Sequence, residues 1–274
     1  MSSDYKSLQL EKGNGIAEVT LLGPGKGNAM GPDFWREMPV LFERLDKDED
    51  VRVVIIRGDG DNFSYGLDLI SMAGDLGAQI SGHNLAAERT RMLDLVGEMQ
   101  KANDRVATCR KPIIAAVAGW CIGGGLDLAA ACDIRICSRE AKFSLREVKL
   151  AIVADIGSLQ RLPRIIGEGR TRELALTGKD IDAAAALRMG LVNEVYQTKE
   201  ALLEEARRTA REIASNPPLV VQGIKQVMNY CQDKSVADGL RYVAVWNSAF
   251  FQSHDLTEAL TAFKERRQPK FQGR

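Results

Sequence analysis

Residues 115–128 read Ala-Ala-Val-Ala-Gly-Trp-Cys-Ile-Gly-Gly-Gly-Leu-Asp-Leu, and this stretch indicates the fold. The apolar run Lys111–Gly119 predicts a buried strand, and a short helix is predicted over 124–131. Because glycine has no Cβ, the backbone of the intervening turn can approach a ligand closely, with its amide hydrogens at the positive end of the helix. The turn is therefore a candidate oxyanion site. Taken alone, a tight turn that only permits helix–sheet packing is an equally good interpretation.

Around this stretch, predicted strands alternate with predicted helices. The expected elements are a hairpin of Leu8–Glu11 and Ile16–Leu22, a helix near 33–46, a strand at Val51–Arg57, a helix over roughly 84–108 and a strand at Asp133–Ser138. This alternation predicts βα crossovers and a mainly parallel sheet. From about 199 to Arg267 the pattern is helical throughout. The fold class is thus α/β, with a core over 1–198 and a helical C-terminal region over 199–274 that is a candidate for subunit contacts.

Charge and composition exclude several classes of function. The 274 residues include 37 basic and 37 acidic ones, so no overall field attracts a polyanion. The five cysteines form no CxxC pair, and buried free thiols in a reducing compartment are expected. No apolar run approaches the length of a membrane span, and no targeting segment is evident. We therefore expect a cytoplasmic protein that binds neither membranes nor nucleic acid.

Several familiar catalytic motifs are incomplete. The chain has only two histidines and contains neither an HExxH motif nor a GxSxG elbow, so zincin and α/β-hydrolase chemistry lack their parts. The loop 23–27 resembles a P-loop superficially, but its Lys26 is followed by glycine rather than serine or threonine. No metal site is expected.

A second glycine turn, Ser64–Asp68, follows the strand at 51–57 as the first turn follows 111–119. Two such turns could supply two amides to one carbonyl oxygen. These residues resemble the crotonase (enoyl-CoA hydratase/isomerase) superfamily, which carries F-x-A-G-x-D-[IL] and A-A-V-x-G-x-x-x-G-G-G-x-[ED]-L segments. Further matching segments cover nearly the whole chain in order: Lys26–Ala29, Leu159–Pro163, Ala175–Gly178, Ala186–Asn193 and Phe263–Arg267.

The resemblance implies a crotonase-like ββα spiral core with a helical C-terminal trimerisation region. It also implies an acyl-CoA substrate, no separate cofactor because coenzyme A is part of the substrate, and a homotrimer or homohexamer. The backbone amides of Leu67 and Gly124 are implied to form the oxyanion hole, which tolerates Tyr65 where the family usually has a small residue. The implied coenzyme A contacts are Lys26, Gly27, Asp68, Phe263 and Arg266.

Three acidic residues, Asp127, Glu147 and Asp155, follow one another at intervals of 20 and 8 residues. Hydratases of the family resemble one another in having glutamates at the first two positions and a glycine at the third. The pattern of this chain resembles that of the Δ3,5-Δ2,4-dienoyl-CoA isomerases. This resemblance implies a role in the β-oxidation of fatty acids. Moving two double bonds needs a base at C2 and an acid at C6, whereas hydration needs two acids around one water. The resemblance implies Asp155 as base, Glu147 as acid, and Asp127 as the group that orients or tunes Glu147.

Each acid also has a purely structural interpretation. Asp127 could complement the dipole of the helix that it begins. Glu147 could pair with Arg146 or Lys149 on a solvated face. Asp155 could cap the following helix. Only the three acids together, at the spacing found in the family, favour catalysis.

Two alternative functions stay open at this point. The first is an enoyl-CoA hydratase or a Δ3,Δ2-enoyl-CoA isomerase, in which a carboxylate at position 155 has no evident place. The second is a non-catalytic crotonase that binds acyl-CoA or RNA. The arginine-rich stretch 204–211 has neighbouring acids and no aromatic residue, which is typical of a solvated helix.

Overall fold

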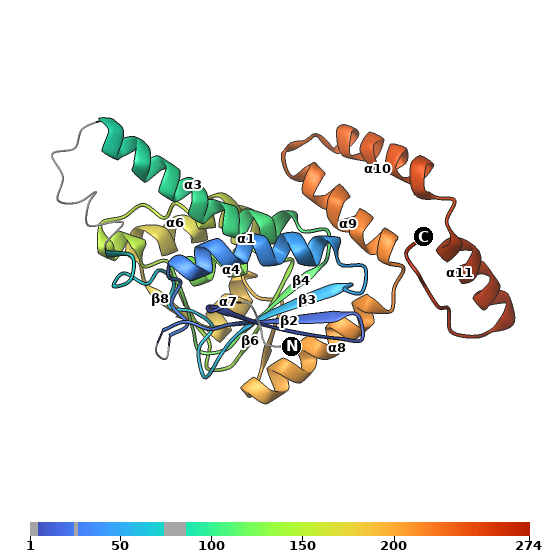
Figure 1. The fold of residues 1–274 in the computed structure, drawn as a ribbon, viewed down its shortest axis with the longest axis horizontal. Coiled ribbons are helices and arrows are strands. Elements are labelled where there is room, and N and C mark those ends of the chain that lie inside the picture. Colours follow the sequence, from blue (N-terminus) through green and yellow to red (C-terminus); the bar gives the residue numbers. More distant parts are fainter. Residues whose placement is uncertain (1–4, 25–26, 74–85) are drawn as a thin grey trace.

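The main sheet of the computed structural model, which describes residues 5–24, 27–73 and 86–274, has six strands (Figure 1). In spatial order they are β1 (Leu8–Gly13), β2 (Ile16–Leu21), β3 (Val53–Gly58), β4 (Ile113–Val117), β6 (Ile134–Ser138) and β9 (Glu194–Tyr196). β1 and β2 pair antiparallel through a turn in which Asn14 and Gly15 have positive φ angles of 52° and 78°. All other neighbours are parallel. The predicted hairpin and the mainly parallel sheet are confirmed.

A second, smaller sheet was not predicted. It consists of β5 (Trp120–Ile122), β7 (Lys142–Ser144) and β8 (Asp180–Asp182). Each strand has three residues, which is too short for a period-two pattern to be visible in the sequence. This sheet matters for the site because β5 leads directly into α4 (Gly124–Ala131), whose residues are all buried.

Helices cover both faces of the main sheet, which explains why its central strands are continuous apolar runs. Alternate residues of β3 point to opposite faces: Val54 and Ile56 join the larger core cluster, and Val53 and Ile55 join the smaller one. The larger cluster packs against α1 (Pro32–Lys47), α3 (Ala86–Thr108) and α4. The smaller cluster packs against one face of α8 (Lys199–Ala214), at Leu202, Ala206, Ala210 and Ala214.

Four further short helices lie near the small sheet. They are η1 (Glu147–Leu150), α5 (Ser158–Ile166), α6 (Glu168–Thr177) and α7 (Ala183–Met189). The connection from η1 to α5, residues 151–157, is irregular. It therefore depends on side chains elsewhere in the fold for its shape.

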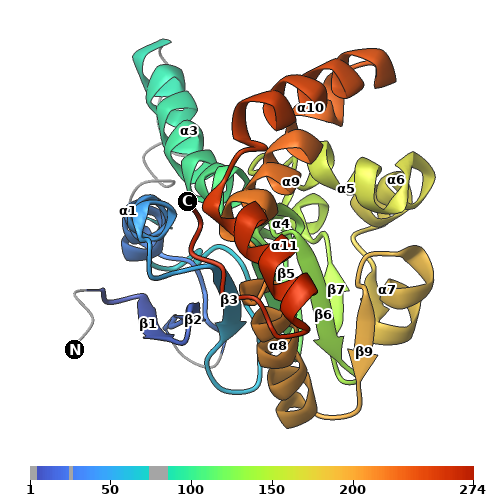
Figure 2. The ribbon, with the colours of Figure 1, turned by 90° about the vertical axis from the view of Figure 1, so that its right-hand side faces the viewer.

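In Figure 1 the C-terminal helices extend to the right, away from the two sheets, and in Figure 2, which is viewed from that side, they lie in front of the sheets. They are α9 (Pro218–Tyr230), α10 (Val236–Phe250), joined to α9 by η2 (Cys231–Asp233), and α11 (His254–Glu265). The predicted all-helical C-terminal region is thus confirmed. None of the helices formed by the described residues is long and apolar enough to cross a membrane.

Candidate active site

A cavity of about 500 Å³ opens between the two glycine turns, η1 and the C-terminal half of α3. Four of the residues singled out in the sequence line it, namely Leu67, Gly124, Glu147 and Asp155. Its apolar wall includes Met99, Ile122, Leu150, Ile152 and Ile156. Sequence reasoning did not identify these wall residues, because their apolar side chains are equally typical of a core.

The two glycine turns are in direct contact. Gly66 has a φ of 80°, and a Cβ atom at this position would lie 2.8 Å from the Gly124 nitrogen. The turn is held by Met30, whose amide donates to the Gly66 carbonyl at 2.7 Å and whose carbonyl accepts from Asp68 at 3.0 Å. Because Met30 binds the groups on either side of Leu67, the Leu67 amide points away from Met30.

The Gly124 amide is free for a different reason. Gly124 is the first residue of α4, so its N–H has no acceptor within the helix and lies at the positive end of the helix dipole. Across the described residues, neither this amide nor that of Leu67 donates a hydrogen bond to the protein. Two unpaired amides on touching turns, both lining the cavity, can bind one developing oxyanion.

Glu147 lies against the glycine turn. A Cβ atom at Gly123 would be 3.1 Å from its Oε1 atom, and its Oε2 atom is buried without a hydrogen-bond partner among the described residues. The solvated-pair interpretation with Arg146 does not hold, since that guanidinium binds both oxygens of Asp180 at 2.8 and 2.7 Å. Burial raises the pKa of Glu147, and the charge of Asp155 raises it further.

Asp155 lines the same cavity from the irregular connection that precedes α5. Helix α5 begins at Ser158 with Gly157 in the capping position and no side-chain capping bond, so the capping interpretation of Asp155 is wrong. The carboxyl group is half-buried, and burial raises its pKa. Glu147 and Asp155 therefore face one space from two different elements.

Asp127 is completely buried and is not among the residues that line the cavity. It lies in the first turn of α4, and its Oδ1 atom accepts a hydrogen bond from the Ser158 amide at the beginning of α5. Its Oδ2 atom is buried without a partner among the described residues. Burial, and then the charge of Glu147, raise the pKa of Asp127 to about 7. This carboxyl group can act on Glu147 electrostatically and on the 155–158 segment through Ser158.

The residues expected to bind coenzyme A are dispersed. The Gly27 carbonyl accepts from the Tyr65 amide at 2.7 Å, and the Tyr65 ring covers Gly27 so closely that a Cβ there would be 2.5 Å from it. Asp68 lies in the adjacent turn, where its carboxylate accepts from the amides of Ile70 and Ser71 at 3.1 Å each. Lys26 lies outside the described residues.

Phe263 and Arg266 are not brought to the cavity within this chain. Both belong to the end of α11, which in Figure 1 lies at the right-hand end of the molecule, well away from α4, the helix that begins at Gly124. The Phe263 side chain is 84% exposed, and Arg266 is exposed as well.

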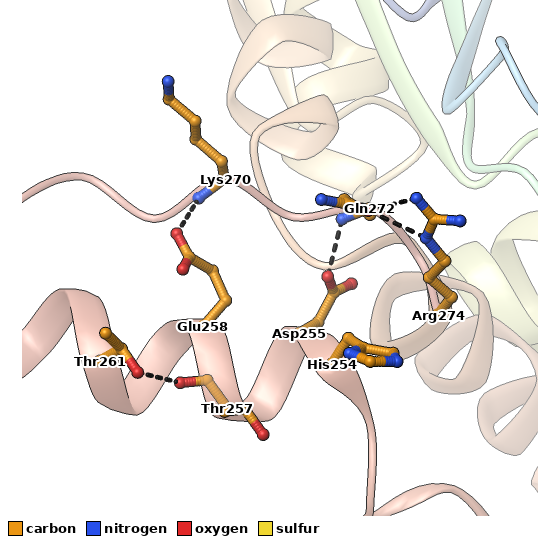
Figure 3. A pocket seen from close by; sticks show the side chains of 8 residues that line it. All are labelled: His254, Asp255, Thr257, Glu258, Thr261, Lys270, Gln272 and Arg274. Carbon is orange, nitrogen blue, oxygen red and sulfur yellow. Dashed lines mark hydrogen bonds between the residues drawn. The ribbon is translucent and has the colours of Figure 1, made fainter.

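A polar hollow on α11 serves to hold the C-terminal tail (Figure 3). The buried carboxylate of Asp255 accepts from the amides of Gln272 and Gly273 at 2.7 and 2.8 Å. Glu258 accepts from the Lys270 amide at 2.7 Å. These carboxylates are thus engaged by the backbone of the chain itself, which favours an architectural role for this hollow over a catalytic one.

Comparison with known proteins gives a consistent result. A family model described as enoyl-CoA hydratase/isomerase matches residues 11–274. A Δ3,5-Δ2,4-dienoyl-CoA isomerase of Dictyostelium discoideum, named as mitochondrial, is 45% identical over 274 residues, covering 98% of this chain and 92% of the relative. A peroxisomal isomerase of the same name from Arabidopsis thaliana is 41% identical over 270 residues, covering 97% of each. The crystal structure of an enoyl-CoA hydratase from Bacillus anthracis superposes with a TM-score of 0.88 at 31% identity, covering 98% of this chain and all of that one.

Proposed function

We propose that this chain, which belongs to the enoyl-CoA hydratase/isomerase (crotonase) family, converts 3,5-dienoyl-CoA into 2,4-dienoyl-CoA. The observation that carries the proposal is Asp155, whose carboxyl group lines the same cavity as Glu147 and the two unpaired amides. The similarity to proteins named as dienoyl-CoA isomerases supports the same reaction.

The reaction begins at the thioester. Its carbonyl oxygen accepts hydrogen bonds from the amides of Leu67 and Gly124, so that the charge formed on deprotonation is stabilised there. Asp155 removes a proton from C2, and the electron pair is delocalised over the conjugated trienolate, from the thioester oxygen to C6. Glu147 then donates a proton to C6, which leaves double bonds at C2 and C4.

The surroundings of the two carboxyl groups agree with these roles as acid and base. Burial and the neighbouring charge of Asp155 favour the protonated form of Glu147, as a general acid requires. Asp155 lines the same cavity and is half-buried, and in this proposal it begins ionised. After one turnover the two groups have exchanged protonation states, and a proton must return to Glu147. Asp127, whose pKa is raised to about 7, changes the proton affinity of Glu147 through its charge and so affects this return.

Hydration is the main alternative, and the arrangement of the acids argues against it. A hydratase uses two acids around one water, at the positions of Asp127 and Glu147, whereas here Asp127 does not line the cavity and Glu147 shares it with Asp155 instead. Nucleic-acid binding has less support, because the arginines of α8 are engaged. Arg207 binds Glu18 with two hydrogen bonds, and Arg208 and Arg211 pair with glutamates on their own helix.

The remaining parts of the proposal concern assembly and location. We propose a homotrimer or homohexamer in which Phe263 and Arg266 reach the coenzyme A of a neighbouring subunit, which fits their exposure on α11. The cytoplasmic location stays a prediction from the sequence, and the relatives described above carry mitochondrial and peroxisomal in their names.

The test is a pair of parallel assays on the purified protein. One follows the rise of 2,4-dienoyl-CoA absorbance from 3,5-dienoyl-CoA, and the other follows hydration of a 2-enoyl-CoA. We expect fast isomerisation with little hydration, and loss of isomerisation in Asp155→Gly, which restores the residue type found in hydratases. Hydration without isomerisation would refute the proposed reaction.

A further inference from the structure

We infer that Gln100 and Asn103, two neighbouring residues on one face of α3, are positioning residues that fix the direction of the Asp155 carboxyl group. The inference rests on the role proposed for Asp155 as the base at C2. It adds α3, a helix that supplies no proposed acid, base or oxyanion donor, to the parts on which the reaction depends.

The first observation is a pair of side-chain hydrogen bonds to consecutive carbonyl groups. Gln100 Nε2 donates to the Asp155 carbonyl oxygen at 2.7 Å. Asn103 Nδ2 donates to the Ile156 carbonyl oxygen at 3.1 Å. Residues three apart lie on the same side of a helix, so the two amide groups act together on one short piece of backbone.

The second observation is that this backbone has no secondary structure to define it. Residues 152–155 are irregular, so their direction depends on groups donated from elsewhere. The far end of the segment is held by the bond from the Ser158 amide to Asp127 and by the ion pair of Arg161 with Asp104 at 2.6 Å. The position of Asp155 is therefore set between α3 on one side and α4 on the other.

The third observation links this clamp to the substrate cavity. Met99, the residue before Gln100, lines the cavity, and Asn103 is completely buried beneath it in the core. The same turn of α3 thus forms part of the apolar wall and holds the base. A shift of about 1 Å in a catalytic group can cost about a hundredfold in rate, so the clamp has a function beyond its contribution to stability.

The charged groups around Asp155 limit how its protonation can respond. Arg146, Glu147 and Lys149 lie along the same cavity, at and just before η1. Asp127 lies on α4, and Arg161 lies on α5 paired with Asp104 of α3. Replacing Gln100 by leucine removes none of these charged groups. If the carboxyl group of Asp155 turns toward water, the burial that raises its pKa is lost, and its pKa falls.

The experiment compares Gln100→Leu with Lys101→Leu, a matched change at an exposed position of the same helix. We expect kcat of Gln100→Leu to fall about 10- to 100-fold, with KM within about twofold of wild type. The acidic limb of the kcat–pH profile should move to lower pH. The Lys101→Leu control should match wild type in kcat, in KM and in the position of the acidic limb.

Two results would overturn the inference. One is a Gln100→Leu enzyme whose kcat and acidic limb equal those of the control. The other is a joint fall of kcat and melting temperature with an unmoved acidic limb, which marks a purely structural residue.

A second measurement separates this inference from the proposed function. The pKa of the Asp155 carboxyl group is measured by ¹³C NMR in protein with labelled aspartate, with Asp155→Asn identifying the signal. If the wild-type protein does not isomerise dienoyl-CoA, the proposed function fails, yet a lower pKa in Gln100→Leu still supports positioning. An unchanged pKa contradicts it whatever the activity.

Discussion

The cavity and the C-terminal helices differ in how far their side chains are exposed to solvent. Around the cavity, the acidic side chains are half-buried or buried within one chain, and Asp127 behind it has 0% exposure. On α9–α11, large apolar side chains are exposed to solvent: Met228 at 68%, Val236 at 81%, Leu240 at 65% and Phe263 at 84%. Such an apolar surface is typical of a subunit interface. The comparison teaches that the carboxyl groups proposed for acid/base catalysis all come from one chain, whereas the exposed apolar face of the C-terminal helices is the one that we propose a neighbouring subunit covers.

The largest expected effect comes from removing an acid that lines the cavity. Glu147→Gln keeps the shape of the side chain but removes the proton that C6 must receive. We expect kcat to fall about 10²- to 10⁴-fold with no change in assembly. Steady-state kinetics beside light scattering measures both. The exposed carboxylate Glu140, changed to glutamine, is the control, and equal kinetics in the two variants would contradict the assignment.

A smaller loss is expected when the two glycine turns are pushed apart. In Gly66→Ala the new Cβ meets the Gly124 nitrogen at 2.8 Å, in a backbone conformation that L residues rarely adopt. Displacing one oxyanion donor should lower kcat about 10²- to 10³-fold. Gly97→Ala, where a Cβ meets nothing within 4 Å in the middle of α3, should keep full activity and gain about 0.5–1 kcal/mol in stability. A fully active Gly66→Ala enzyme would refute the two-amide site.

The buried acid behind the cavity makes stability depend on pH. The pKa of Asp127 is raised from 3.8 to about 7, so its proton is held more tightly in the folded state. That contribution is complete below pH 3.8 and is lost as pH rises through about 7. Asp127→Asn should remove up to about 4 kcal/mol of this pH dependence. Urea unfolding between pH 4 and 8 measures it, and parallel curves for the two proteins would contradict the raised pKa.

The smallest effect on the chain itself is expected on the C-terminal side. Leu240→Glu puts a charge on an exposed position of α10, which costs a single chain little but disrupts an interface. We expect a lower mass by light scattering and a melting temperature lower by a few degrees. Leu176→Glu, at a 75% exposed position of α6, is the matched control. An unchanged mass in Leu240→Glu would contradict the proposed use of this face.

The sequence predicted those parts of the fold and site that have a local signal. The hairpin was visible from the turn at Asn14 and Gly15, and the buried strands from their apolar runs. The acids Glu147 and Asp155 were identified by their spacing, and the structure places both on one cavity. The capping interpretation of Asp155 is contradicted because Gly157 occupies the capping position of α5.

What the sequence did not predict depends on tertiary contacts. The strands β5, β7 and β8 are too short to show a periodicity. Met99, Gln100 and Asn103 have no local signal, because every amphipathic helix has apolar residues at intervals of three and four with polar residues between them. The division between 198 and 199 stays a prediction. Helix α8, which begins at Lys199, packs closely on the main sheet.

The central claim, proton removal at C2 and delivery at C6 by two carboxyl groups, is tested most directly in D₂O. The purified protein converts 3,5-dienoyl-CoA in D₂O, and the product is examined by NMR and mass spectrometry. The account predicts 2,4-dienoyl-CoA that carries solvent deuterium at C6, with none formed by Asp155→Asn. Deuterium confined to C4, or a product carrying a hydroxyl group from water, would contradict it.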